Sequence, residues 1–150
     1  MRRAYLLGLI LVSLPATAVG EEPGDAKRYE ISCQGTATED DGRSHSESFT
    51  WIVDESAPAS EQIFHNGKSV CEGATSCSVE IKPYHIRIRT AHERTESGRK
   101  STVEFDVTVN RVSGIAKGKG FGTETQGNVV KQHSMEATFS CDKYPFKRVI

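Results

Sequence analysis

Apolar and polar residues alternate with a period of two along most of the chain from Tyr29 onward. The pattern is clearest over residues 103–109, where Glu104, Asp106 and Thr108 separate four apolar side chains. It recurs over residues 29–33, 49–53, 77–81, 86–88 and 135–141. Successive side chains of a strand point to opposite faces, so this period predicts β-strands with one apolar and one polar face. No stretch of ten residues has helical spacing, and residues 57–62 are expected to form a single turn.

Short turn signals separate these segments. They are Asp40-Asp41-Gly42, Asn66-Gly67, Glu72-Gly73, Ser97-Gly98, Ser113-Gly114 and Gln126-Gly127-Asn128. Asn66-Gly67 is the strongest, because both residues tolerate the positive φ that a two-residue type I′ hairpin turn requires. It predicts a hairpin that pairs Phe64 with Ser69 and Ile63 with Val70.

The strand pattern predicts an all-β fold built from a single antiparallel sheet of about seven to nine strands. Closing that sheet into a barrel, or folding it into a sandwich, would protect its edges. The predicted domain covers residues 29–150, and polar residues 21–28 are expected to form a flexible leader. Trp51 and Phe105, each central in an alternating segment, are expected in the core. Small residues on one face of 115–121 predict close packing at a bend of the sheet.

The first twenty residues have the pattern of a signal peptide. Arg2 and Arg3 precede an apolar run over residues 4–12, and small residues allow cleavage after Ala18 or Gly20. The apolar run is about half of the roughly 20 residues that span a bilayer. The sequence therefore predicts a periplasmic or secreted protein with no integral membrane segment once the signal is removed.

Charge argues against a nucleic-acid partner. Removing residues 1–20 takes away two of the 19 basic residues and none of the 20 acidic ones, which leaves 17 against 20 and a net charge of −3. Proteins that bind nucleic acid carry a basic surplus, which this chain lacks. We therefore expect no nucleic-acid binding.

Four cysteines behind an export signal indicate two disulfides, for which three pairings exist. We predict Cys33–Cys141, which would join the first and last strands, and Cys71–Cys77, which flank a short turn. No Cys/His spacing of the zinc type occurs, and we predict neither a metal nor another cofactor.

The most highly charged strand is a candidate recognition patch. His85, Arg87 and Arg89 project from one face, where they could bind an anionic group. The next strand, however, offers Glu104 and Asp106 on its own polar face. We expect these charges to form structural cross-strand pairs, each worth about 0.2–1 kcal/mol, and keep the recognition patch as the alternative.

A specific register follows from that expectation. If the numbers of paired residues add up to 193, Arg89 faces Glu104 and Arg87 faces Asp106. The same register would also bring apolar side chains together, Ile88 with Phe105 and Ile86 with Val107.

Catalytic motifs are missing from the sequence. There is no G-x-S-x-G nucleophile elbow, and all four cysteines are assigned to disulfides. We predict no catalytic residue and no enzymatic activity.

Four segments carry a resemblance to small exported proteobacterial proteins that are β-barrel-like and have no assigned function. These segments are Tyr29–Gly35 (Y-x-I-x-C-x-G), residues 51–54, Val107–Gly114 with its Asn-Arg-x-Ser-Gly end, and Cys141 followed by Pro145-Phe146. The layout is also similar to that of periplasmic lysozyme-inhibitor barrels and lipocalin-like binders. The resemblance implies a fold but transfers no activity and no site residue.

We therefore expect a non-enzymatic β module that binds a partner protein or a small ligand. The alternatives are an exported enzyme whose site is assembled from separate strands, and a structural component of the cell envelope. An apolar cavity would favour ligand binding, whereas titratable groups converging in a cleft would favour catalysis.

Overall fold

The computed structural model describes residues 28–145, so the predicted signal peptide lies outside the described residues. Nine antiparallel strands form one sheet with the order β4-β3-β2-β1-β9-β8-β7-β6-β5. The elements are β1 (Arg28–Glu39), β2 (Ser44–Asp54), the 3₁₀ turn η1 (Ala59–Glu61), β3 (Ile63–His65), β4 (Lys68–Ser69), β5 (Ser76–Ile81), β6 (His85–Glu96), β7 (Arg99–Asn110), β8 (Ile115–Gln126) and β9 (Val129–Pro145). The all-β antiparallel prediction is confirmed.

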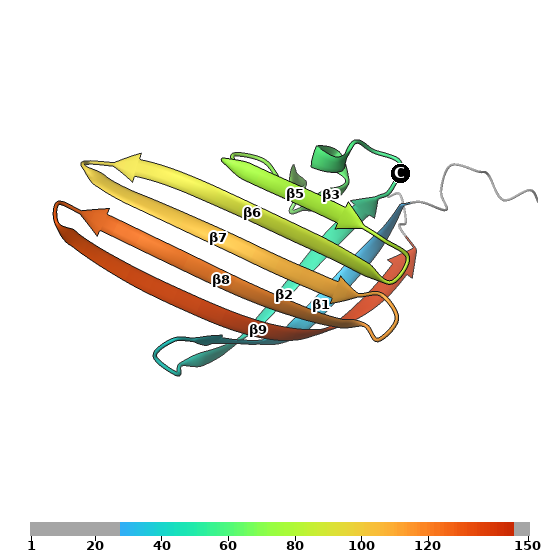
Figure 1. The fold of residues 1–150 in the computed structure, drawn as a ribbon. Helices are drawn as coiled ribbons and strands as arrows, with labels where there is room; N and C mark the ends of the chain where they lie inside the picture. The colour runs from blue at the N-terminus through green and yellow to red at the C-terminus, as the bar shows by residue number, and fades with distance from the viewer. Residues whose placement is uncertain (1–27, 146–150) are drawn as a thin grey trace, which may run out of the picture.

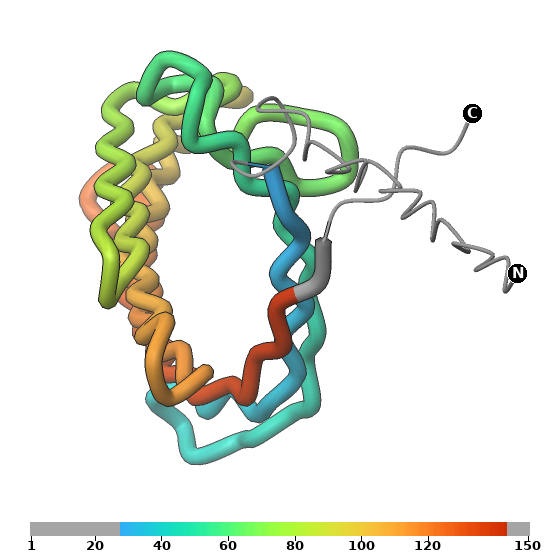
Figure 2. Tube along the Cα trace, turned by 90° about the vertical axis from the view of Figure 1, so that its right-hand side faces the viewer, coloured from blue at the N-terminus to red at the C-terminus, as the bar shows by residue number. Residues whose placement is uncertain are grey.

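The sheet curls into a barrel-like shape and does not form a sandwich (Figure 1). Seen end on, the chain traces an oval ring in which β1 and β2 face β6 and β7 (Figure 2). The short strands β4 and β5 are the two edges of the sheet. No helix in residues 28–145 has the length and apolar character needed to cross a membrane.

Two disulfides hold this sheet together, with the predicted pairing. Cys33 and Cys141 are directly opposite each other on β1 and β9, with Cα atoms 4.0 Å apart. Cys71 and Cys77 join the loop after β4 to β5, so their bond links the two sheet edges.

The turn at Asn66-Gly67 forms the expected hairpin. Asn66 and Gly67 have φ angles of 52° and 77°, and Phe64 pairs with Ser69 as predicted. The amide of Val70 donates to the carbonyl of Ile63 over 3.0 Å, which extends the hairpin by one further pair.

The predicted register of β6 and β7 is wrong by two residues. Arg89 faces Asp106 and not Glu104, and Arg87 faces Thr108. The apolar pairs shift equally, giving Ile88 with Val107 and Ile86 with Val109. Because the shift is even, every side chain stays on its predicted face.

The core lies on the inner face of the curled sheet, near the end where β1 begins. Val53, Ile63 and Ile86 are fully buried there, and Trp51 is buried as predicted. The prediction that Phe105 belongs to the core is wrong, because 40% of its surface is exposed. Phe105 does point to the inner face, but it lies near the middle of β7, where it lines a cavity.

A polar cluster ties distant loops together at the end of the barrel where β1 begins. The hydroxyl of Tyr29 donates to Glu55 over 2.7 Å, and the guanidinium of Arg111 donates to the same carboxylate oxygen over 2.9 Å. Arg111 also donates to the carbonyl of Lys82 over 2.8 Å. Burial and the hydrogen bond to Glu55 raise the pKa of Tyr29, so its hydroxyl stays protonated as the donor.

Candidate functional site

An apolar cavity of about 600 Å³ lies between the two walls of the barrel. One wall is formed by β2 and the β3–β4 hairpin, and the other by β6 and β7, which face each other in Figure 2. The lining residues are Phe49, Trp51, His65, Asn66, Lys68, Ser69, Val70, Glu72, Ile88, Thr90, His92, Phe105 and Val107. The volume falls within the range of about 300–1,000 Å³ that is typical of small-molecule sites.

Aromatic rings form the β2 side of this cavity. Phe49 and Trp51 are two residues apart on β2 and therefore share the inner face, with ring centroids 4.6 Å apart. Phe49 also meets Phe139 of β9 edge to face at 5.0 Å. These aromatic contacts stabilise the β2 side of the cavity in the absence of a ligand.

The β3–β4 hairpin forms the rim and is held by its own polar contacts. His65 Nδ1 donates to the carbonyl of Thr50 over 3.1 Å, and the side-chain amide of Asn66 donates to His65 Nε2 over 3.1 Å. These two bonds hold the His65 ring between Thr50 of β2 and Asn66 of the turn. At the entrance, Lys68 Nζ lies 3.2 Å from Glu72 Oε1 in an exposed ion pair.

The β6 wall becomes polar toward the hairpin end. Ile88, Thr90 and His92 alternate along its inner face and all line the cavity. Thr90 is only 8% exposed, whereas His92 is partly buried. The alternation along residues 86–92 is visible in the sequence, but sequence reasoning did not select Thr90 or His92 as site residues.

The predicted recognition patch lies on the outer face of β6, away from the cavity. Arg87 Nε donates to Asp106 Oδ1 over 2.9 Å, and Arg89 Nε lies 3.6 Å from Asp106 Oδ2. His85 Nε2 lies 3.2 Å from Glu80 Oε1. The hydrogen bond from Arg87 lowers the pKa of Asp106 and raises that of the guanidinium. All three predicted patch residues are therefore engaged with acids of neighbouring strands.

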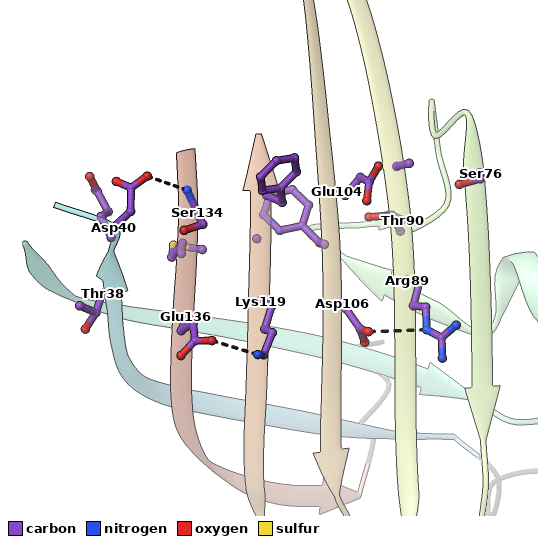
Figure 3. Close-up of a pocket in the computed structure, with 16 residues that line it drawn as sticks. Thr38, Asp40, Ser76, Arg89, Thr90, Glu104, Asp106, Lys119, Ser134 and Glu136 are labelled. Carbon is purple, nitrogen blue, oxygen red and sulfur yellow. Dashed lines mark hydrogen bonds and ion pairs between the residues drawn. The ribbon is translucent and has the colours of Figure 1, made fainter. Parts of the chain in front are cut away.

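A shallow depression of about 800 Å³ crosses this outer face (Figure 3). One side of it is a row of charges that alternate in sign from β6 to β9, namely Arg89, Asp106, Lys119 and Glu136. Lys119 Nζ lies 2.9 Å from Glu136 Oε1. Because neighbouring charges neutralise one another, the row is explained by cross-strand stabilisation of the sheet.

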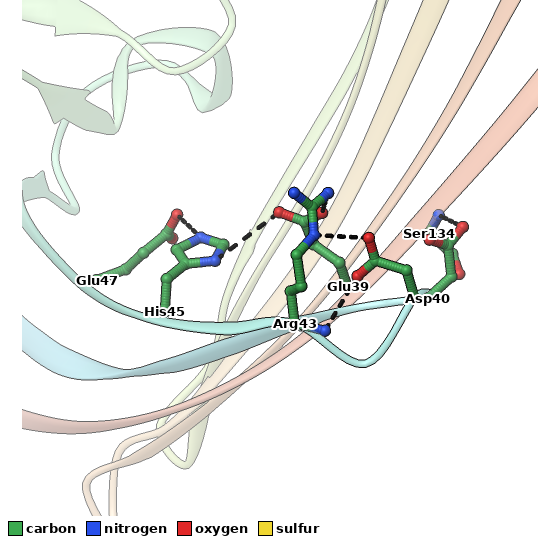
Figure 4. A network of polar contacts seen from close by, with 7 residues as sticks. Glu39, Asp40, Arg43, His45, Glu47 and Ser134 are labelled. Atoms are coloured by element: carbon green, nitrogen blue, oxygen red, sulfur yellow. Dashed lines mark hydrogen bonds and ion pairs between the residues drawn. The ribbon is translucent and has the colours of Figure 1, made fainter.

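A second polar network surrounds the β1–β2 turn (Figure 4). Arg43 binds Asp41 at 2.6 Å and Glu39 at 2.8 Å, and His45 Nε2 lies 2.9 Å from Glu47. The backbone amide of Arg43 donates to Asp41 and lowers the pKa of that carboxyl. These bonds stay within one hairpin and shape its turn. Within residues 28–145, no three His, Cys, Asp or Glu side chains converge in a way that could hold a metal ion.

Comparison with protein-family models, curated proteins and solved structures finds no match for this chain.

Proposed function

We propose that this protein is an exported, non-enzymatic β module that binds a small, largely apolar molecule in the cavity between β2–β4 and β6–β7. One observation carries the proposal. Between the two walls of the barrel, the inner-face side chains Phe49, Phe105 and Val107 border an open space of about 600 Å³. Apolar surface left at a concave opening is a common property of ligand sites, because covering it releases water.

The two disulfides support the exported part of the proposal. Disulfides form and persist in oxidising compartments such as the periplasm or the extracellular space, and are rare in the cytosol. This agrees with the signal-peptide pattern of residues 1–20.

Trp51 provides a direct test, because it is the only tryptophan of the chain and lines the cavity. The neutral probe N-phenyl-1-naphthylamine should gain fluorescence on binding and quench Trp51. Filling the cavity with Val107→Phe should weaken probe binding by at least about tenfold, which corresponds to about 1.4 kcal/mol.

Thr108→Phe is the matched control, because it adds a ring at the next residue, on the opposite face of β7. It should leave probe affinity within about twofold of the unmodified protein. Thermal unfolding followed by circular dichroism should show that both variants are folded. Equal probe binding by Val107→Phe and the unmodified protein, or no binding by either, would contradict the proposal.

A further inference from the structure

Thr90 is the one polar residue among the buried residues of the described chain. Its hydroxyl makes no hydrogen bond to any residue in 28–145, although 92% of the residue surface is covered. Every fully enclosed side-chain nitrogen or oxygen of this part of the chain does have a partner, so the Thr90 hydroxyl is not fully enclosed. Thr90 lines the cavity and also the depression of Figure 3.

Further donors lie on the same cavity. His92 follows Thr90 on the inner face of β6, lines the cavity, and makes no side-chain hydrogen bond or ion pair with another residue of the described range. Lys68 contributes an ammonium group at the entrance, where its ion pair with Glu72 is exposed and therefore weak. Glu72 is the only acidic residue among those lining the cavity.

We propose that the ligand is an amphiphile, with an apolar chain or ring and one terminal carboxylate. This inference rests on the proposed function, because the apolar part occupies the same cavity beside Phe49, Phe105 and Val107. The carboxylate accepts hydrogen bonds from the Thr90 hydroxyl and from a ring nitrogen of His92. Lys68 contributes favourable charge at the entrance, and hydrogen bonds to a charged group are worth more than those to a neutral one.

Two soluble ligands with identical tails test this assignment, namely dodecanoate and dodecyltrimethylammonium. Each is titrated below its micelle concentration against protein loaded with N-phenyl-1-naphthylamine. Dodecanoate should displace the probe at a concentration at least about tenfold lower than the cation needs. Thr90→Val keeps the shape of the side chain and removes the hydroxyl. It should weaken dodecanoate binding by about tenfold and leave the affinity for the probe within about twofold of that of the unmodified protein.

Thr108→Val makes the same change on the outer face of β7 and should alter the affinity for neither dodecanoate nor the probe. Equal affinity for the two amphiphiles would overturn the carboxylate assignment while leaving the apolar site intact. So would a Thr90→Val variant whose affinities for dodecanoate and for the probe fall equally. A protein that binds neither the probe nor dodecanoate would instead overturn the proposed function itself.

Discussion

Gly35 lies where β1 bends against β9, opposite Phe139. A Cβ atom added to Gly35 would lie 2.6 Å from the Cα of Phe139 and would also collide with the carbonyl of Thr138. Both obstacles belong to the backbone, which cannot move aside as a flexible side chain can. The absence of a side chain at Gly35 therefore allows the backbones of β1 and β9 to approach this closely.

We expect Gly35→Ala to lower the free energy of unfolding by at least about 3 kcal/mol, the upper part of the range for overpacked sites. Gly122→Ala on β8 is the matched control, because the nearest atom to its new Cβ would be 3.8 Å away. Alanine is less flexible than glycine in the unfolded chain, so this variant should be neutral or slightly stabilised. Urea denaturation measures both, and similar midpoints for the two variants would contradict this account of Gly35.

Phe105 shows what alternation predicts and what it does not. The period-two pattern places its side chain on the inner face, and the structure agrees. Depth along the barrel is a different property, because it depends on which residues stand opposite across the interior. Those residues come from β2 and β4, far away in the sequence, so the exposure of Phe105 could not be predicted from its own segment.

The β6–β7 hairpin takes its register from its turn. Ser97 and Gly98 both have positive φ, 50° and 77°, and the two-residue loop directly pairs Glu96 with Arg99. Counting back from that turn gives every pair of the hairpin. The sequence contains this signal, whereas the register with sum 193 follows from matching charges directly across the strands. The hydrogen-bonded ion pair is diagonal, from Arg87 to Asp106, a geometry that long side chains reach easily. Arg89, directly opposite Asp106, forms a longer ion pair with it at 3.6 Å.

We expect Asp106→Asn to lower the free energy of unfolding by roughly 0.5–1 kcal/mol at pH 7, a modest amount because both partners are more than one-third exposed. The hydrogen bond from Arg87 lowers the pKa of Asp106 below its ordinary value of 3.8. The stabilisation is therefore present above about pH 4 and is lost as the pH falls through the folded-state pKa. Urea midpoints at pH 7 and pH 2.5 should show the difference between the two proteins shrinking in acid.

Glu104→Gln is the control for this change, because Glu104 lies on the same outer face and forms no ion pair with a described residue. It should leave the midpoint nearly unchanged at both pH values. A larger effect from Glu104→Gln than from Asp106→Asn would restore the predicted pair between Arg89 and Glu104.

At the scale of the whole molecule, the two disulfides differ in the length of chain that they close and in their position. Cys33–Cys141 closes 108 residues of sequence, whereas Cys71–Cys77 closes only six and holds the rim of the cavity beside β5. The loop-closure argument assigns about 4–5 kcal/mol to the first and about 2 kcal/mol to the second.

We therefore expect the double substitution Cys33→Ala with Cys141→Ala to cost about twice as much stability as Cys71→Ala with Cys77→Ala. Probe affinity should respond in the opposite way. Among folded protein, loss of Cys71–Cys77 should weaken probe binding more than loss of Cys33–Cys141, because Val70 and Lys68 line the cavity next to the short bridge. Urea denaturation and probe titration measure the two effects. Equal stability losses, or a stronger effect of the long bridge on probe affinity, would contradict this division.

The overall architecture could be predicted because each part of it has a local cause. Alternation identifies the strands, glycine turns identify the hairpins, and the paired cysteines connect the ends. The cavity has no such local cause. It results from the distance between two walls that come from separate parts of the chain, residues 49–72 and residues 88–107, and sequence patterns carry no measure of that distance.

The position of β1 between β2 and β9 has a consequence for the order of events as the chain is made. β2 follows β1 directly, so one edge of β1 can pair early, but its other edge stays bare until β9 has been synthesised. During that interval Cys71 and Cys77 are already present as alternative partners for Cys33, whereas its native partner Cys141 comes 108 residues after it. Correct oxidation therefore depends on timing: Cys33 must remain unpaired until the final strand has arrived to bring Cys141 opposite it.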